Sequence, residues 1–166
     1  MIQTPFVKRL LLGLFAVVVL EVMAAPSALA GGPQRVPLLI PPTGTFAGLC
    51  AFDVDYAIVV NNEYNIVFFD SAGTVVKAIT EGHLVVTFTN ASNGNRMTLN
   101  ISGPGTATFN ADGSQTLVFL GNGVLFSGND IIYSKGRVVI VAPDPLSPGV
   151  IVSVSGNQRS LCAMLA

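Results

Sequence analysis

Two aspartates separated by one residue are the first candidates for chemistry in the sequence. Asp53 and Asp55 alternate with apolar residues in CAFDVDYA, a pattern typical of a strand. On a strand the two carboxyl groups would share a face, about 6–7 Å apart, which is within the range that paired acids use in glycoside hydrolysis. Neighbouring outward carboxylates are also ordinary solubilising residues, and this is the interpretation we favour.

The second candidate is His83, the only histidine and hence the only residue of the type that titrates near neutral pH. It follows Glu81 by two residues on the polar face of a predicted strand, so a Glu81–His83 dyad can be written. No serine or cysteine nucleophile can be attached to this dyad from the sequence. We therefore interpret His83 as an exposed residue at a strand end and predict no catalytic residue.

These residues lie beside the clearest predicted element, a β-hairpin over residues 83–102. Apolar and polar residues alternate with period two in both segments, and Asn93-Gly94 between them tolerates the positive φ of a tight turn. One face of the hairpin carries Leu84, Val86, Phe88, Met97, Leu99 and Ile101. We expect this face to point into the core.

The same alternation continues on both sides of the hairpin. It predicts about nine or ten short strands with a turn signal about every ten residues. The first strand is expected to begin near Phe46 and to carry Cys50, Phe52, Val54 and Tyr56 inward. We interpret residues 61–65, 121–123 and 135–136 as breaks or turns between strands. Residues 143–149 hold three prolines and predict a loop, and the tail 159–166 is expected to dock through Leu161, Cys162 and Leu165.

The N-terminal residues have the organisation of a secretory signal peptide. Lys8 and Arg9 precede an apolar run over residues 10–20, and Ala28-Leu29-Ala30 offers a cleavage site after residue 30. The apolar run is too short to span a bilayer, so we expect no stable membrane anchor after cleavage. Residues 31–45 follow as a proline-rich extended leader, and residues 46–166 are expected to form a single β domain. The predicted localisation is secreted or extracellular.

Charge and cysteine content narrow the function classes. Residues 31–166 hold six basic and eight acidic side chains, a formal charge of −2, and no basic cluster, which disfavours a nucleic-acid partner. Cys50 and Cys162 are the only cysteines, and an even number in an oxidising compartment favours one disulfide between them over two separate buried thiols. Two distant cysteines and one histidine match no metal-ligand spacing, so no metal and no cofactor are expected.

Many short strands with tight connections indicate an antiparallel all-β meander. We expect a small β-barrel of about eight strands, with a β-sandwich as the alternative, because closure removes the exposed edges of a sheet. The bridge between Cys50 and Cys162 would close the domain by joining its two ends.

The sequence resembles a loosely defined group of small exported all-β proteins of unknown function from high-GC Gram-positive bacteria. The residues that suggest it are Cys50-Ala51-Phe52-Asp53-Val54, the segment TLNISGPG at residues 98–105, and LCAMLA at residues 161–166. The resemblance implies export and an all-β fold, and it transfers no catalytic residue.

Three functions remain open at this stage. The preferred one is a secreted, non-catalytic β-domain that acts by binding or at the cell surface. The second is a barrel that binds a small apolar ligand, with a lipocalin-like or dirigent-like architecture and a candidate lining of Phe52, Tyr56, Leu84, Val86, Phe88, Met97 and Leu99. The third is an isomerase or cyclase, which would need an ionisable group inside, and Tyr56 is the candidate.

Overall fold

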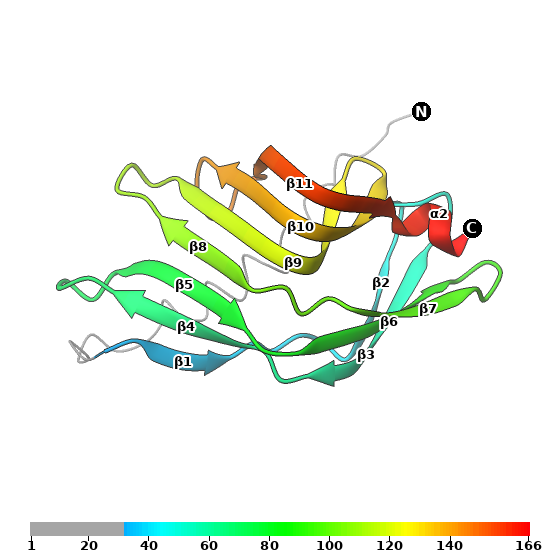
Figure 1. Cartoon of the computed structure of the whole chain (residues 1–166), viewed down its shortest axis with the longest axis horizontal. Coiled ribbons are helices and arrows are strands. Elements are labelled where there is room, and N and C mark those ends of the chain that lie inside the picture. Colours follow the sequence, from blue (N-terminus) through cyan, green and yellow to red (C-terminus); the bar gives the residue numbers. More distant parts are fainter. Residues whose placement is uncertain (1–31) are drawn as a thin grey trace, which may run out of the picture.

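A computed structural model describes residues 32–166, which form an all-β structure with one short helix (Figure 1). The strands are β1 (Gln34–Pro37), β2 (Thr43–Phe46), β3 (Val54–Asn61), β4 (Tyr64–Phe69), β5 (Val75–Glu81), β6 (Leu84–Asn90), β7 (Arg96–Asn100), β8 (Gly105–Phe109), β9 (Gln115–Ser127), β10 (Asp130–Ala142) and β11 (Val150–Ser160). Helix α2 (Leu161–Leu165) ends the chain. The predicted signal peptide, residues 1–30, lies outside the described residues.

The strands form two antiparallel sheets. Several long segments of the chain each contribute one strand to each sheet. One sheet has seven strands in the order β1-β4-β5-β8-β9-β10-β11, and the other has four in the order β2-β3-β6-β7. Strand β4 continues β3 and β6 continues β5, so the pair β3–β6 and the pair β4–β5 belong to one long hairpin. In the same way, residues 34–46 pair with residues 54–69, and residues 96–109 pair with residues 75–90. Each long segment thus pairs with the next one along the chain, and the predicted meander is confirmed.

The bend between the sheets crosses this hairpin at Asn62-Glu63 and Gly82-His83. The backbone stays paired through the bend, because the Asn62 amide donates to the His83 carbonyl oxygen at 3.0 Å. Gly82 has φ +131°, and a Cβ at Gly82 would meet the Cα of Glu63 at 2.5 Å. Glycine is therefore required where the two segments approach most closely.

The expected turns at residues 121–123 and 135–136 are wrong, because both segments lie inside long strands. Gly121 pairs with Gly136, and Gly136 pairs with Gly156 on the next strand, so the three glycines form a row across β9, β10 and β11. All three have positive φ, at +76°, +153° and +96°. A Cβ at Gly136 would collide with the Ser155 carbonyl oxygen. The row bends three strands together without ending them, which is why a turn signal in the sequence became a bend in the sheet.

Beyond the glycine row, the ends of β9 and β10 lie over the four-stranded sheet, and α2 covers the end of the molecule (Figure 1). On one side, β10 is linked to β7 of the four-stranded sheet by the Tyr133 hydroxyl, which donates to the Asn100 carbonyl oxygen at 3.2 Å. On the other side the rings of Phe46 and Phe126 lie 5.1 Å apart. These are side-chain contacts, and no strand ladder closes the described residues into a barrel. The closed barrel of about eight strands is therefore not confirmed.

Two further boundaries differ from the sequence-based expectation. The leader segment supplies β1 and β2, each paired at the outer side of a sheet, in spite of its prolines. The first strand of the predicted domain begins at Val54, so Cys50 and Phe52 are not on a strand. Residues 47–53 instead form a loop that turns Leu49 into the core. Gly48, with φ +72°, permits that turn.

Candidate functional site

The candidate ligand-lining residues gather at the end of the molecule that α2 covers, which we call the enclosed end. Leu84, Val86 and Phe88 on β6 are buried in one cluster with Leu49, Val54, Ile131, Leu161 and Leu165. The partly buried residues packed against this cluster include Phe52, Tyr56, Met97 and Leu99. The structure therefore brings all seven predicted residues together, as side chains of the hydrophobic core. A ligand among them stays a prediction.

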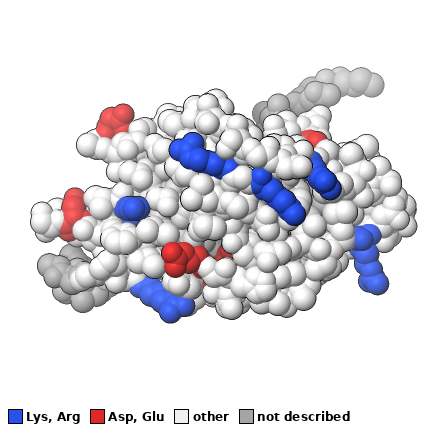
Figure 2. All heavy atoms as spheres, in the orientation of Figure 1, with Lys and Arg blue, Asp and Glu red and all other residues white. Residues whose placement is uncertain are grey.

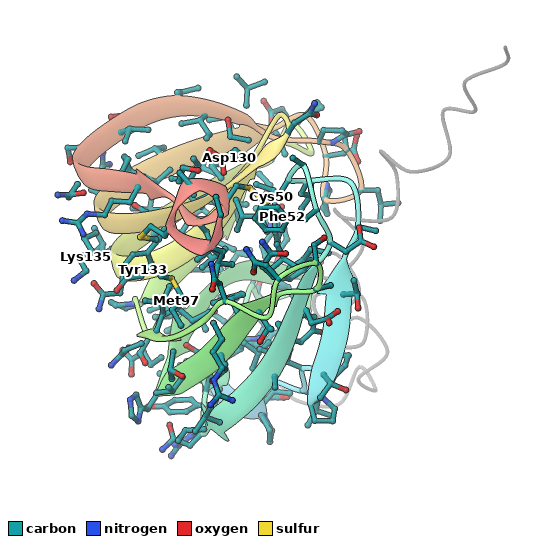
Figure 3. The ribbon with its side chains drawn as sticks, turned by 90° about the vertical axis from the view of Figure 1, so that its right-hand side faces the viewer. Cys50, Phe52, Met97, Asp130, Tyr133 and Lys135 are labelled. Atoms are coloured by element: carbon teal, nitrogen blue, oxygen red, sulfur yellow. A yellow bond between two sulfur atoms is a disulfide. The ribbon has the colours of Figure 1, made fainter. Side chains whose placement is uncertain are left out.

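The disulfide between Cys50 and Cys162 is present, with the two Cα atoms 5.5 Å apart. It joins the loop before β3 to helix α2 across 112 residues of chain. Figure 3 looks onto α2, with Cys50 and Phe52 on one side of the helix and Met97 and Tyr133 on the other. The predicted pairing of the cysteines is confirmed, and it closes the enclosed end.

The paired aspartates face solvent outside the core. Asp55 lies on β3 and accepts a hydrogen bond from the Thr45 hydroxyl at 2.6 Å. Asp53 precedes the strand, and its carbonyl oxygen accepts from the Ala91 amide at 3.0 Å. Both side chains are exposed, so the structure supports their interpretation as solubilising residues.

The Glu81–His83 dyad does not form among the described residues. Glu81 accepts a hydrogen bond from the Tyr64 hydroxyl at 3.1 Å, and the Tyr64 ring also lies under the Arg35 guanidinium. The His83 ring is exposed, and its Nε2 lies 3.4 Å from the Asn100 amide nitrogen. The two side chains thus have separate partners. At the bend, His83 contributes its backbone carbonyl oxygen, which accepts the hydrogen bond from the Asn62 amide.

Glu63 is the residue that the sequence-based prediction missed. It lies at the bend before β4 and alternates with buried Asn65 and Val67, so its side chain is on the buried face with only 8% of the residue exposed. No hydrogen bond or ion pair to its carboxyl group occurs within residues 32–166. Burial raises its pKa from the ordinary 4.5 to about 7, because the charged form is poorly solvated there.

Two other buried polar residues of the seven-stranded sheet are paired. Asn65, on β4, accepts a hydrogen bond from the Thr80 hydroxyl at 2.7 Å. Gln158 donates to the buried Ser134 hydroxyl at 2.9 Å. Glu63 thus differs from these two residues, since it is a largely buried acid with no protein partner, and its carboxyl oxygens keep some contact with solvent. Alternation over residues 63, 65 and 67 was the only available signal for it, and the polar run NNEYN obscured that signal.

The surface carries a second feature, an exposed apolar strand. Figure 2 shows charged side chains as isolated groups separated by wide uncharged areas. On β11 and the loop before it, Val150 is 66% exposed, and Leu146 is 69% exposed. Val141 on β10 is paired with Val150 and is also exposed. We call Val141, Leu146 and Val150 the end patch.

Comparison with known proteins adds no identity: no protein family, curated protein or solved structure matches the chain. The resemblance to exported all-β proteins therefore stays a prediction. Across residues 32–166, no group of three or more histidine, cysteine, aspartate or glutamate side chains could hold a metal ion. Nor does this part of the chain contain a helix that is long and apolar enough to cross a membrane.

Proposed function

We propose that the chain is an exported β-domain that acts by binding at the cell surface, with the end patch as its contact. The observation that carries this proposal is the exposure of Val150, at 66%, together with its exposed cross-strand partner Val141 and with Leu146, 69% exposed, in the loop between their strands. Large apolar side chains left exposed at one end of a sheet favour a protein or membrane contact, because covering them removes apolar area from water. The disulfide and the predicted signal peptide support an extracellular setting.

The test compares where the protein is found in cultures of the producing cells. The variant Leu146→Ser/Val150→Ser removes the apolar contact, and it should shift the protein from the cell-surface fraction into the medium. The matched control is Leu39→Ser/Val59→Ser, which changes the same residue types at similarly exposed positions elsewhere. An unchanged distribution for the end-patch variant would refute the proposal. So would a hydrolase activity that is lost on substitution of Asp53 or His83.

A second candidate function is favoured by Glu63. Binding of a small amphipathic ligand inside the curled sheet needs an apolar lining and a polar group that fixes one end of the ligand. The core cluster would supply the apolar lining, and Glu63, a largely buried acid at the bend between the sheets, has no protein partner for its carboxyl group. Of the sequence-based alternatives, the isomerase or cyclase needs such an inward group. Glu63 fills this role better than Tyr56, whose ring stacks on Phe46 with the centroids 5.0 Å apart.

This candidate is tested with two probes of equal chain length, a fatty amine and a fatty acid. A buried carboxylate pairs with the ammonium group and repels the carboxylate, so the amine should raise Tm more than the acid does. Glu63→Gln should abolish that preference, and Glu81→Gln, an exposed acid on β5, should retain it. If neither probe raises Tm, or if Glu63→Gln leaves the preference intact, the interior is not a ligand site.

A further inference from the structure

Three basic residues share one face of strands β10 and β11. Lys135 and Arg137 are separated only by Gly136 on β10, so their side chains lie on the same face, with the Cα atoms about 6–7 Å apart. Arg159 on β11 pairs with Tyr133, which places it diagonally across from Lys135, at about 7–8 Å. All three basic side chains are exposed. We call Lys135, Arg137 and Arg159 the basic group.

Strand pairing creates the basic group, because Arg159 is far from the other two residues along the chain. The residues that flank Lys135 and Arg137 on the opposite face, Ser134 and Val138, are buried, as alternation requires. Figure 2 shows basic side chains close together over β10 and β11. A cluster of positive charge is therefore present on the folded chain, although the sequence contains no basic run.

No acid neutralises the basic group. Residues 131–143 and 145–160 contain neither Asp nor Glu. Asp130 and Asp144, the acids that flank these ranges, accept hydrogen bonds from nearby hydroxyl and amide groups instead. Within residues 32–166, no acidic side chain forms an ion pair with the basic group. Charges farther away than about 8 Å are largely screened at physiological salt, so the local positive charge determines what binds here.

The same face of β10 continues to the end patch. Val141 follows Arg137 at an even spacing, and the irregularity in the pairing adds a residue to β11 and not to β10, so alternation places Val141 on the face of Arg137. Val141 is exposed and pairs with the exposed Val150. One strip along β10 and β11 thus carries basic side chains in one part and exposed apolar side chains in the other.

We propose that this strip binds an anionic lipid surface, with the basic group on the phosphate headgroups and the end patch in the apolar layer beneath them. An anionic bilayer offers both negative charge and an apolar layer, whereas a polyanionic polymer offers only the charge. An apolar protein partner would cover the end patch and leave the basic group without a counter-charge. The inference rests on the proposed function, and it identifies the partner at the cell surface as lipid.

Vesicle sedimentation tests this proposal on protein purified from culture medium. The unchanged protein should bind vesicles of phosphatidylcholine and phosphatidylglycerol in equal parts and should not bind vesicles of phosphatidylcholine alone. Each basic residue near an anionic surface contributes about fivefold in affinity, so Lys135→Gln/Arg137→Gln/Arg159→Gln should weaken binding by about 100-fold. Raising the NaCl concentration to about 0.5 M should weaken binding of the unchanged protein, without any substitution.

Two further variants separate this strip from net charge and from charge alone. The matched control Arg35→Gln/Lys77→Gln/Arg96→Gln makes the same change of net charge on β1, β5 and β7, and it should weaken binding by less than about tenfold. The variant Leu146→Ser/Val150→Ser keeps the basic group and should weaken binding by about tenfold or more, because the apolar contact is lost. Thermal unfolding checks that each variant is folded.

The proposal is overturned if the unchanged protein does not bind the phosphatidylglycerol vesicles, or binds phosphatidylcholine vesicles equally well. It is also overturned if the matched control loses as much affinity as the basic-group variant does. Equally tight binding to dextran sulfate, unaffected by Leu146→Ser/Val150→Ser, would identify a polyanionic polymer as the partner instead. If vesicles are not bound but Leu146→Ser/Val150→Ser still moves the protein from the cell surface into the medium, the proposed function stands and only the lipid partner is removed.

Discussion

Glu63 combines burial with a titratable group and no partner, and its protonation is therefore coupled to folding. The folded chain holds its pKa at about 7, above the ordinary 4.5, so the folded state binds this proton more tightly than the unfolded state does. The stability that this provides is fully present below about pH 4.5 and is lost as the pH rises to about 7. Above that range the folded chain carries a partly desolvated carboxylate with no protein partner.

Substitution of Glu63 by Gln should remove this pH dependence. The amide keeps the shape of the side chain and cannot ionise, so the variant should be more stable than the unchanged protein at pH 8 and similar to it at pH 4.5. Thermal unfolding at pH 4.5, 6 and 8 measures the difference. Glu81→Gln, on the exposed acid of β5, should keep the decline of the unchanged protein. Parallel Tm curves for the unchanged protein and Glu63→Gln would show that Glu63 is not the group responsible.

Helix α2 is held by more than the disulfide. Leu161 and Leu165 are almost fully buried, and the Ser160 hydroxyl accepts from the Ala163 amide at 2.9 Å to cap the helix. The side-chain amide of Asn90, itself buried, donates to the Leu165 carbonyl oxygen at 3.1 Å. The helix has only five residues, too few to be stable alone, so these contacts determine its position.

Removal of both cysteines, as Cys50→Ala/Cys162→Ala, should therefore lower stability without releasing α2. A bridge across 112 residues is worth about 2–5 kcal/mol, because it restricts the unfolded chain. Urea unfolding measures that loss. The Leu165 amide should stay protected from hydrogen exchange in the double variant, and Leu161→Ala, which leaves a cavity under the helix, should expose it. Free exchange of this amide in the cysteine variant would show that the disulfide alone holds the helix.

The row of glycines Gly121, Gly136 and Gly156 is the feature that bends strands β9, β10 and β11. Gly136→Ala should destabilise the fold by about 1–3 kcal/mol or more, because a side chain is strained at this φ and would meet the Ser155 carbonyl oxygen. Gly123→Ala is the matched control in β9, where φ is not positive and nothing lies within 4 Å of the added Cβ. It should change stability by less than about 0.5 kcal/mol. Equal losses for the two variants, measured by urea unfolding, would contradict the role of the row.

The same row explains which elements could be predicted from the sequence. Period-two alternation gave the hairpin of β6 and β7, whose pairs Val86–Leu99 and Phe88–Met97 place the predicted residues on one face. Alternation is local, so it is reliable wherever one face is buried. A glycine at a bend and a glycine at a turn have the same local signature, and only pairing with strands distant in sequence distinguishes them. The local sequence therefore predicts turns at Gly121 and Gly136, which lie inside paired strands.

Only part of the candidate site can be predicted from the sequence, because alternation is a local signal and pairing between distant strands is not. The inward set from Phe52 to Leu99 follows from alternation, and the structure gathers it into the core cluster. Glu63 lies where two strands bend without ending, and the surrounding asparagines match a loop. The exposure of Val150 and Val152 could not be predicted either, because an apolar alternating strand at a sheet edge has the same sequence as one in its middle.

For the whole molecule, the enclosed end and the paired strands define the unit that removal of the predicted signal peptide would have to leave intact. Strand β1 begins at Gln34, so cleavage after Ala30 would leave every described strand intact. The Gln34–Val67 and Arg35–Ile66 pairs that start the seven-stranded sheet would also remain. Processing at this position is therefore compatible with the complete fold.

Secreted protein should accordingly have Gly31 as its N-terminal residue. Ala28-Leu29-Ala30 is the small-residue site that follows the apolar run, and signal peptidase cleaves after such a site. Mass spectrometry of protein from the medium measures the N-terminus directly. Ala30→Leu places a large residue at the cleavage position and should leave uncleaved chain, whereas Gly31→Ala, beyond the cleaved bond, should be processed normally. Recovery of chains that begin at Met1 from the membrane fraction of unaltered cells would show that residues 1–30 are retained as an anchor.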